Sequence, residues 1–317
     1  MLLKYIVFLL VIFTLSNAQK DSKFSGKGKY GGRGRQKSSL QSSSSKNSSA
    51  FSNSKDRQLI NKIINGSSGT KAQYPFIVQL FERSNSSTPF AYSCTGSLIS
   101  NQWVLTAAHC VTDKKRNFLS PPNFRVAAGN AQLVKGSDIN SLYQVSSMGA
   151  FGYKANPSLD LALIKLKTTV PASVSTPARF YTGPVTPSLP VTVAGFGVTK
   201  FGTSIPSDVL LQTRVNISQS SNCSIFNNDW KSNTGPQVCQ ESYNGHDSCQ
   251  GDSGGPLVTT VGGQNVIVGI TNDGGNKDPR ATNGCGYNVI AYYARLGYYA
   301  SGISKVIGVP LSTLVAT

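Results

Sequence analysis

Short apolar or alternating stretches recur along the chain from Ile63 onward. Gly, Pro, Asn and Ser separate them, and the clearest stretches cover residues 76–81, 103–107, 161–166, 191–194 and 266–270. Many short strands divided by turn residues, with almost no helical periodicity, are typical of an all-β sandwich or barrel. One segment differs, because residues 299–307 space their apolar side chains at helical intervals and stop before Gly308 and Pro310. This pattern predicts a short C-terminal helix.

The first 18 residues have the pattern of a secretory signal peptide. Lys4 precedes an apolar run over residues 5–15, and Ser16-Asn17-Ala18 supplies small residues one and three places before a cut. The alternative is a membrane anchor, but a bilayer-spanning helix needs about 20 apolar residues, and neither this run nor any later window provides them. We therefore expect a secreted, extracellular protein without a transmembrane anchor.

Residues 19–62 hold most of the excess positive charge. The chain has 30 Lys and Arg against 13 Asp and Glu, a formal net charge of +17, and residues 20–62 alone contain 11 of these basic residues and two of the acidic ones. They also contain 12 Ser and five Gly, so they lack the apolar side chains that a core requires. The segment is predicted to be a disordered basic propeptide that rests on anionic surfaces. Charge confined to a tail does not favour specific binding of nucleic acid.

Six cysteines lie in the remaining part of the chain. An oxidising export route favours three disulfides, and the count alone leaves their pairing open. A zinc site is the alternative, but the chain has no Cys-x-x-Cys pair and only two histidines, His109 and His246. The cysteines are Cys94, Cys110, Cys223, Cys239, Cys249 and Cys285.

Three segments contain residue types suited to nucleophilic catalysis. They read Leu-Thr-Ala-Ala-His-Cys at residues 105–110, Leu-Asp-Leu-Ala-Leu-Ile-Lys-Leu at 159–166, and Asp-Ser-Cys-Gln-Gly-Asp-Ser-Gly-Gly-Pro at 247–256. Together, and in the chain order His, Asp, Ser, they resemble the chymotrypsin/trypsin family of serine proteases. The resemblance extends from Ile63 to about Ile307. A lone histidine or a lone strand-edge aspartate is usually structural, but three matching segments in order favour a catalytic site.

The resemblance implies two antiparallel Greek-key β-barrels with a short C-terminal helix. In this interpretation the serine protease domain covers residues 63–317. Barrel one is expected at 63–171, barrel two at 172–298 and the helix at about 299–307. The substrate cleft is expected between the two barrels.

The resemblance also implies the catalytic roles. A serine hydroxyl is a poor nucleophile until a base takes its proton, and here Ser253 corresponds to the nucleophile and His109 to the base. Asp160 corresponds to the carboxylate that holds the imidazole in the right tautomer. Glycines around Ser253 permit a tight turn that aims the N–H groups of Gly251 and Ser253 at the oxyanion.

The resemblance further implies a specificity pocket and three disulfides. Asp247, with Ser248 beside it, corresponds to the base of a pocket that receives Lys or Arg, because a buried carboxylate favours a cation. Gly274 and Ala291 correspond to the lining of this pocket, where the methyl group of Ala291 narrows it. The implied disulfides are Cys94–Cys110, Cys223–Cys239 and Cys249–Cys285.

The stretch Lys62-Ile63-Ile64-Asn65-Gly66 resembles the activation junction of the family. A cut after Lys62 would free the amine of Ile63 to pair with Asp252, the neighbour of the nucleophile. Such a partner is needed because a buried carboxylate costs free energy unless its charge is paired. The alternative is that the stretch is an ordinary linker between the tail and the fold.

Several positions depart from the family pattern. Asn272-Asp273-Gly274 stands where the family usually has Ser-Trp-Gly along the substrate channel. Phe196 and Gly302 replace two other tryptophans of the family. A carboxylate at Asp273 would remove an apolar wall and attract basic side chains, unless it belongs to a turn and faces water.

No cofactor and no metal is expected. Between His109 and Asp160 there is no Glu and only Asp113 and Asp138, so the carboxylate-rich calcium loop of the family is not evident. Five Asn-x-Ser sequons are candidates for N-glycosylation in a eukaryotic secretory route. They begin at Asn47, Asn65, Asn85, Asn216 and Asn222.

The sequence therefore predicts a secreted serine endopeptidase, made as a zymogen, that cleaves after Lys or Arg through an acyl-enzyme. Its expected partners are polypeptide substrates and protein protease inhibitors. Two alternatives stay open. One is a catalytically weak homologue that binds or inhibits another protein, and the other is a cationic surface-adhesion protein that acts through its tail. The intact set of catalytic residues, together with Gly251 and Asp247, favours the enzyme.

Overall fold

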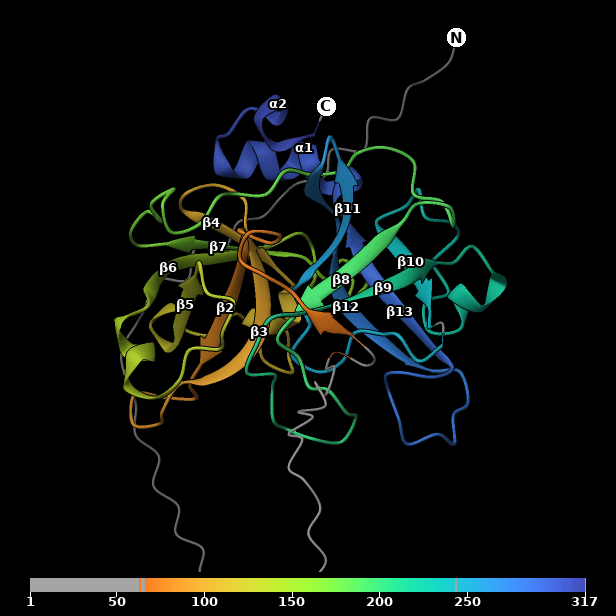
Figure 1. Ribbon diagram of the computed structural model, residues 1–317, viewed down its shortest axis with the longest axis horizontal. Helices are drawn as coiled ribbons and strands as arrows, with labels where there is room; N and C mark the ends of the chain where they lie inside the picture. Colours follow the sequence, from red (N-terminus) through yellow and green to blue (C-terminus); the bar gives the residue numbers. More distant parts are fainter. Residues whose placement is uncertain (1–62, 64–65, 243, 317) are drawn as a thin grey trace, which may run out of the picture. The chain divides into compact units, whose positions relative to one another are not determined.

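Six antiparallel strands close into the first barrel (Figure 1). The computed structural model describes residue 63 and residues 66–242 and 244–316, so the predicted signal peptide, the predicted propeptide and Lys62 lie outside the described residues. The strand order is β2-β3-β4-β7-β6-β5, and pairing of β2 with β5 closes the barrel. The strands are β2 (Ile77–Glu82), β3 (Ala91–Leu98), β4 (Trp103–Thr106), β5 (Phe124–Ala128), β6 (Tyr143–Ala150) and β7 (Ala162–Leu166).

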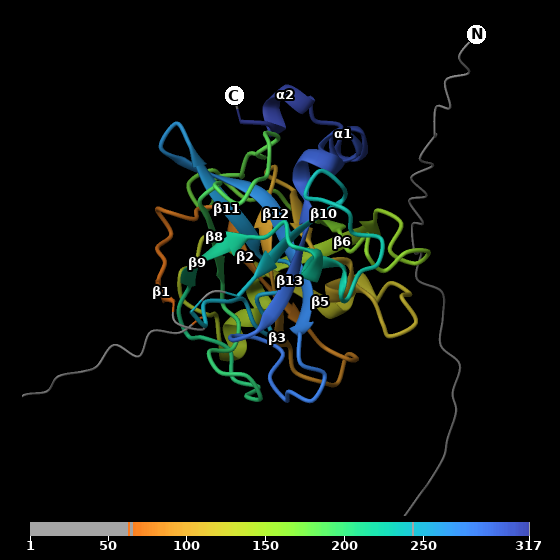
Figure 2. The same ribbon diagram turned by 90° about the vertical axis from the view of Figure 1, so that its right-hand side faces the viewer.

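Six further antiparallel strands form the second barrel, which faces the viewer in Figure 2. Their order is β9-β10-β13-β12-β11-β8, and β8 pairs with β9 to close the ring. A two-residue strand, β1 (Ser67–Ser68), pairs with the first two residues of β9. The barrel strands are β8 (Val191–Gly195), β9 (Leu211–Ile217), β10 (Gln237–Glu241), β11 (Pro256–Val261), β12 (Gln264–Asn276) and β13 (Val289–Arg295).

Each barrel has its own core, and a third cluster joins the two barrels. Side chains alternate between the two faces of a strand, so one apolar set from each strand fills the barrel interior. Leu80 and Val126 belong to the core of the first barrel, and Val193 and Leu257 to that of the second. The joining cluster contains Phe76, Leu105, Phe196 and Ile270. Since it draws residues from both barrels, it fixes one barrel against the other.

The α-helices follow the last strand of the second barrel. Helix α1 (Leu296–Ile307) begins directly after β13, three residues before the predicted start, and Gly308 ends it in the left-handed conformation with φ 70°. Such a C-terminal glycine adopts this conformation without steric cost. After Pro310 comes α2 (Leu311–Leu314), which was not predicted. The remaining helices are short 3₁₀ turns, η1 (Ala108–Val111), η2 (Pro121–Asn123), η3 (Gly136–Ser141) and η4 (Ser221–Ser224).

The structure confirms the predicted all-β fold of two antiparallel barrels with a short C-terminal helix. The strands of the first barrel lie between residues 77 and 166, and those of the second barrel between residues 191 and 295. Among the described residues, no helix is long and apolar enough to cross a membrane.

Candidate active site

His109 lies in η1, the 3₁₀ turn that directly follows β4. Ala107 keeps an extended backbone before the turn, and Cys110 is joined by a disulfide to Cys94 on β3. The disulfide therefore ties the turn to a barrel strand. About a third of the His109 side chain is exposed, so the imidazole has one face toward solvent.

Asp160 precedes β7 and holds His109 at two points. Its Oδ2 lies 2.7 Å from His109 Nδ1, and its Oδ1 accepts the backbone N–H of His109 at 2.9 Å. The carboxylate is buried. This double contact fixes the orientation of the ring and favours a proton on Nδ1, which leaves Nε2 as the free base position.

The pKa of His109 is raised above its ordinary value. Burial opposes protonation of the ring, but the hydrogen bond and charge of Asp160, together with the charge of Asp273, outweigh it. Asp273 thus acts on His109 electrostatically from the second barrel. The sequence comparison with the family placed Asp273 in the substrate channel but did not indicate this effect.

Ser253 lies in a tight turn before β11. Gly251 and Gly254 on either side have φ values of 91° and 77°. Residues that carry a side chain rarely adopt such a backbone conformation. A Cβ on Gly254 would lie 2.0 Å from Thr106 Oγ1. Glycine is therefore required for the turn to pack closely against β4. The carbonyl of Ser253 accepts the N–H of Thr95 from β3 at 3.0 Å, so the turn is bound to the first barrel.

Ser253 and His109 line the same cavity, but no hydrogen bond joins them within the described residues. His109 Nε2 instead lies 3.7 Å from Cys110 Sγ. The expected direct contact between base and nucleophile is thus not formed in this conformation. Catalytic hydrogen bonds are often long without substrate and tighten when substrate binds.

The backbone around Ser253 offers donors for a negatively charged oxygen. The carbonyl of Gly251 is held by Tyr92 Oη at 2.7 Å and by Thr95 Oγ1 at 3.0 Å. Within the described residues, the N–H groups of Gly251 and Ser253 donate to no protein acceptor. Such unpaired N–H groups can stabilise a negative charge on an oxygen bound beside them.

Asp252 is completely buried beside this turn. Its Oδ1 accepts the N–H of Gly197 at 2.8 Å and its Oδ2 that of Cys249 at 2.9 Å. Burial raises the pKa of Asp252 to about 6, although these two hydrogen bonds lower it. A Cβ on Gly197 would lie 2.5 Å from the carboxylate. The carboxylate therefore has backbone donors, but no close ion pair with a cation of the described residues.

Ile63 directly follows the predicted cut after Lys62, and the structure describes this residue. Its side chain is fully buried, and its φ is 69°. A positive φ is strained for a β-branched residue. Lys62, Ile64 and Asn65 lie outside the described residues.

Asp247 is a fully buried residue of the cavity lining. Its Oδ2 accepts the N–H of Gly286 at 2.9 Å and its Oδ1 that of Ser248 at 2.9 Å. Burial raises the pKa of Asp247 to about 7, against the effect of these hydrogen bonds. The cavity has a volume of about 340 Å³ and is lined by both barrels. All the predicted pocket residues line it, namely Asp247, Ser248, Gly274 and Ala291.

Ala291 and Gly274 face each other across the pairing of β12 with β13. A Cβ on Gly274 would lie 3.1 Å from Ala291 Cα and 2.5 Å from the Ile290 carbonyl. The cavity wall is therefore formed by backbone at Gly274 and by one methyl group at Ala291. The structure also joins the six cysteines in the three pairs that the resemblance implies, with Cys249–Cys285 beside this pocket.

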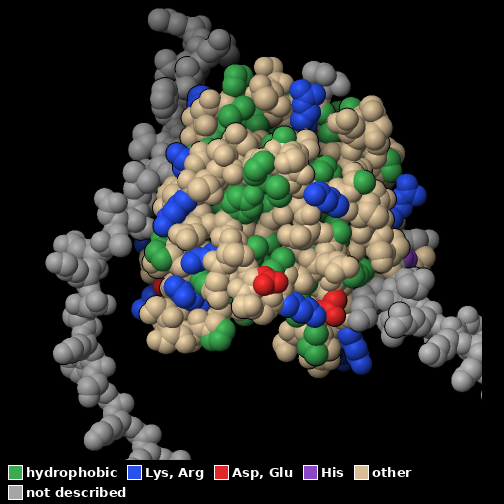
Figure 3. All heavy atoms as spheres, turned by 60° about the vertical axis from the view of Figure 1, so that its left-hand side comes forward, with side chains coloured by type: hydrophobic (Ala, Val, Ile, Leu, Met, Phe, Trp, Pro, Cys, Tyr) green, Lys and Arg blue, Asp and Glu red, His purple; other side chains and the backbone are tan. Residues whose placement is uncertain are grey.

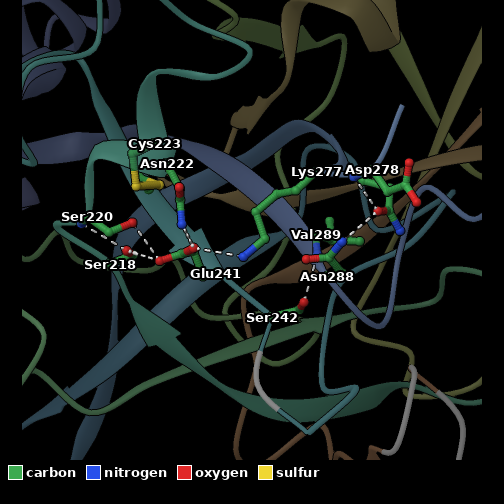
Figure 4. A network of polar contacts seen from close by, with 12 residues as sticks. Ser218, Ser220, Asn222, Cys223, Glu241, Ser242, Lys277, Asp278, Asn288 and Val289 are labelled. Carbon is green, nitrogen blue, oxygen red and sulfur yellow. Dashed lines mark hydrogen bonds and ion pairs between the residues drawn. A yellow bond between two sulfur atoms is a disulfide. The ribbon is translucent and has the colours of Figure 1, made fainter. Parts of the chain in front are cut away.

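A network of polar contacts around Glu241 supports the loop between β12 and β13, which contributes residues to the pocket lining (Figure 4). At the end of β10, Glu241 Oε2 accepts from the hydroxyls of Ser218 at 2.6 Å and Ser220 at 2.8 Å. Its Oε1 accepts from Asn222 Nδ2 and Lys277 Nζ, both at 3.0 Å. Burial would raise the pKa of Glu241, but these four hydrogen bonds lower it to about 2.

Lys277 begins the segment that connects β12 to β13. The same segment carries Cys285 and Gly286, and the N–H of Gly286 reaches Asp247. The ion pair of Lys277 with Glu241 therefore anchors one end of this loop, and the other end contacts Asp247 in the pocket.

Two further contributions were not anticipated from the sequence. Tyr153 and Pro157, from the loop before Asp160, line the cavity. Asn272 Nδ2 donates to the backbone carbonyl of Asp160. Neither contact has a sequence signal, because each joins segments that only the packing of the barrels brings together.

One group of the described residues has the ligand atoms and spacing of a metal site, Cys94, His109 and Cys110. Both of its cysteines are joined in a disulfide, so no thiolate is present to bind a metal.

Comparison with known proteins agrees with this geometry. Residues 63–300 match the family model described as trypsin. Trypsin delta and trypsin gamma of Drosophila melanogaster are each 31% identical over 221 residues, which cover 68% of this chain and 80% of theirs. Trypsin eta of Drosophila erecta is 30% identical over 251 residues, which cover 77% and 89%. The chain belongs to the trypsin family and is a trypsin-like serine protease.

Proposed function

We propose that the protein is an endopeptidase that cleaves polypeptides after Lys or Arg, with Ser253 as nucleophile. The observation that carries the proposal is the cavity itself. It brings together a histidine held at two points by a buried aspartate, the buried carboxylate of Asp247, and a serine near two N–H groups, its own and that of Gly251, that donate to no acceptor among the described residues.

The reaction follows from these positions. Ser253 Oγ attacks the carbonyl carbon of the bond to be cut while His109 Nε2 takes the hydroxyl proton. The negative charge that develops on the carbonyl oxygen is stabilised by the N–H groups of Gly251 and Ser253. His109 then gives the proton to the leaving amine, and water hydrolyses the acyl-enzyme by the same route. Asp160 would stabilise the charged imidazole through its contact with Nδ1.

Specificity would come from Asp247. A buried carboxyl whose pKa is about 7 ionises fully when a cation binds beside it, because an opposite charge lowers the pKa. A Lys or Arg side chain supplies this cation. Ser248, Gly274 and Ala291 shape the walls, and the methyl group of Ala291 narrows the space next to Gly274.

Zymogen activation is part of the proposal. A cut after Lys62 would release the charged amine of Ile63, and Asp252 is a fully buried carboxylate with backbone donors alone. Pairing of the two charges would lower the pKa of Asp252 and fix the adjacent turn of Ser253. It would also release the strained backbone of Ile63. Cleavage by the mature enzyme itself is consistent with Lys62 as the residue before the cut.

Secretion, protein protease inhibitors as partners and N-glycosylation belong to the same proposal. Three disulfides are consistent with an oxidising compartment. Asn85, Asn216 and Asn222 are exposed, as glycan acceptors must be.

One observation favours a second candidate, a catalytically weak homologue that binds another protein. It is the missing hydrogen bond between Ser253 and His109 in the described conformation. The two candidates differ in one measurement, turnover of a peptide substrate after cleavage at Lys62.

The test compares the precursor before and after limited cleavage, using peptides with Arg, Lys, Phe or Leu before the cut. We expect turnover of the Arg and Lys peptides only after cleavage. Ser253→Ala should lower turnover by about a million-fold, Lys62→Gln should stay inactive, and Asp247→Ser should lose the basic preference. Activity of uncut Lys62→Gln would refute the activation step. Equal turnover in Ser253→Ala would refute the mechanism.

A further inference from the structure

The two barrels differ in charge. Residues 63–171 contain ten Lys or Arg and four Asp or Glu, whereas residues 172–316 contain eight and seven. Figure 3 shows the first-barrel side of the molecule, where blue basic side chains outnumber red acidic ones. The electrostatic field of the folded domain is therefore positive mainly over the first barrel.

Four of these basic residues lie together in two linked loops. Lys114, Lys115 and Arg116 belong to the loop that leaves η1, and Lys154 belongs to the loop before Asp160. Arg116 Nη1 donates to the Lys154 carbonyl at 3.2 Å, and Lys154 Nζ donates to Asn117 Oδ1 at 2.9 Å. We call Lys114, Lys115, Arg116 and Lys154 the basic rim.

The loop that presents Lys114 and Lys115 is held in shape by Asp113. Its Oδ1 accepts the N–H groups of Lys115 at 2.8 Å and Asn117 at 2.9 Å, and its Oδ2 accepts Asn117 Nδ2 at 3.3 Å. A bridge between Thr112 and Phe118 closes the base of the loop. Asp113, the one acidic residue of this loop, therefore stabilises the loop itself through these hydrogen bonds.

The charges of the basic rim are available to a partner. Lys114, Lys115 and Lys154 are exposed. Among the described residues, no carboxylate forms a close ion pair with any of the four. Asp113 is the one acidic residue of these two loops, so the four basic residues leave a net positive charge that attracts an acidic partner.

The basic rim belongs to two loops that also carry, or directly follow, residues of the active-site cavity. Its first loop leaves the turn that carries His109, and its second loop contains Tyr153, which lines the cavity. The Arg116 guanidinium lies 5.8 Å from the centre of the Tyr153 ring. The cavity itself is acidic, because its lining includes three carboxylates, Asp160, Asp247 and Asp273.

We propose that the basic rim binds acidic side chains of the polypeptide substrate, next to the basic residue that enters the cavity. This inference rests on the proposed function and narrows its substrate class. The favoured sites have Lys or Arg before the cut and Asp or Glu within a few residues of it. An acidic cavity whose loops also carry basic residues matches this order of charges.

The test uses cleaved protein and pairs of peptides with Arg before the cut. Each pair has Asp or Glu, or else Asn or Gln, at one of the four positions on either side. We expect kcat/KM to rise by up to about fivefold for an acid at a position that reaches the rim, since one exposed ion pair contributes up to about 1 kcal/mol. Raising the salt concentration should reduce the gain, because salt screens exposed charges.

Two variants test the basic rim directly. Lys114→Gln/Lys115→Gln should reduce the gain to about twofold or less, and Lys114→Glu/Lys115→Glu should reverse it in favour of basic flanking residues. The matched control is Lys200→Gln/Lys305→Gln, two exposed lysines of the second half of the chain. This control should keep the preference, and all variants should retain turnover of the uncharged-flank peptide.

The outcomes separate this proposal from the proposed function. If Arg peptides with uncharged flanks are cleaved and acids at no position improve cleavage, the basic rim does not bind substrate. The same conclusion follows if a sulfated polysaccharide binds the rim while acidic peptides gain nothing. If no Arg peptide is cleaved after activation, the proposed function itself fails.

Discussion

Asp273 places a second carboxylate near His109, in addition to Asp160. In the proposed mechanism His109 must be neutral to accept a proton, so kcat/KM falls as the pH drops through its pKa. Asp273 raises the pKa of His109. Asp273→Asn should therefore lower this pKa and shift the acidic limb of the pH profile of kcat/KM to lower pH.

The measurement is kcat/KM against pH for an Arg peptide with uncharged flanks. Asp229→Asn removes an exposed carboxylate that does not line the cavity, and it should leave the profile in place. An unchanged profile in Asp273→Asn would show that its charge does not reach His109.

Residues with a local sequence signature were predictable, whereas those defined by packing were not. The context of Ser253 and Asp247 lies within ten consecutive residues, and the positive φ of Gly251 explains why glycine is needed there. Tyr153 and Asn272 reach the site through tertiary contacts. The sequence around Tyr153 does not indicate its place in the cavity, and the family pattern placed Asn272 along the substrate channel without indicating its contact with Asp160.

At the scale of elements, the network of Glu241 connects β10, the region of η4 and the loop after β12. Glu241→Gln keeps the shape of the side chain but removes the charge that accepts four hydrogen bonds. We expect the free energy of unfolding at pH 7 to fall by about 1–2 kcal/mol, since both Glu241 and Lys277 remain about one quarter exposed. Urea unfolding in a Ser253→Ala background, which prevents self-digestion, measures this loss.

The effect of Glu241→Gln should depend on pH in one direction. The pKa of Glu241 is lowered from 4.5 to about 2 in the folded protein. Its stabilising effect is therefore complete above about pH 4.5 and is lost as the pH falls toward about 2. Asp229→Asn, a change in an exposed residue outside this network, serves as the control. A difference between wild type and Glu241→Gln that stays constant down to pH 2 would contradict the assignment.

Strands were easier to predict from the sequence than the ends of helices. Alternating or apolar stretches such as residues 161–166 coincide with barrel strands, because burial of a barrel strand imposes that pattern. The start of α1 was placed three residues late. Strand β13 runs directly into the helix without a turn residue. Leu296, the first residue of the helix, is buried like most of the strand residues before it, so burial does not mark the boundary.

At the scale of the whole molecule, the strand pattern alone did not distinguish a sandwich from a barrel. The prediction of two barrels came from the resemblance to the protease family. The cavity depends on this pairing, because His109 and Asp160 belong to one barrel and Ser253 and Asp247 to the other. Thr95 of β3 bonds to the carbonyl of Ser253. Relative movement of the barrels would therefore change the distance between nucleophile and base.

The distribution of charge gives a prediction for the complete chain. Residues 20–62 contain 11 basic and two acidic residues and no cysteine, so a cut after Lys62 would release them from the folded domain. We expect the Ser253→Ala precursor to elute from a cation-exchange matrix at clearly higher salt than the same protein after cleavage by an added protease. Several charges on one segment bind an anionic surface together, and salt weakens that binding steeply. The cleaved protein should still bind at low salt through the basic rim, more weakly in Lys114→Gln/Lys115→Gln. Elution of precursor and product at the same salt concentration would show that the tail does not hold the protein on anionic surfaces.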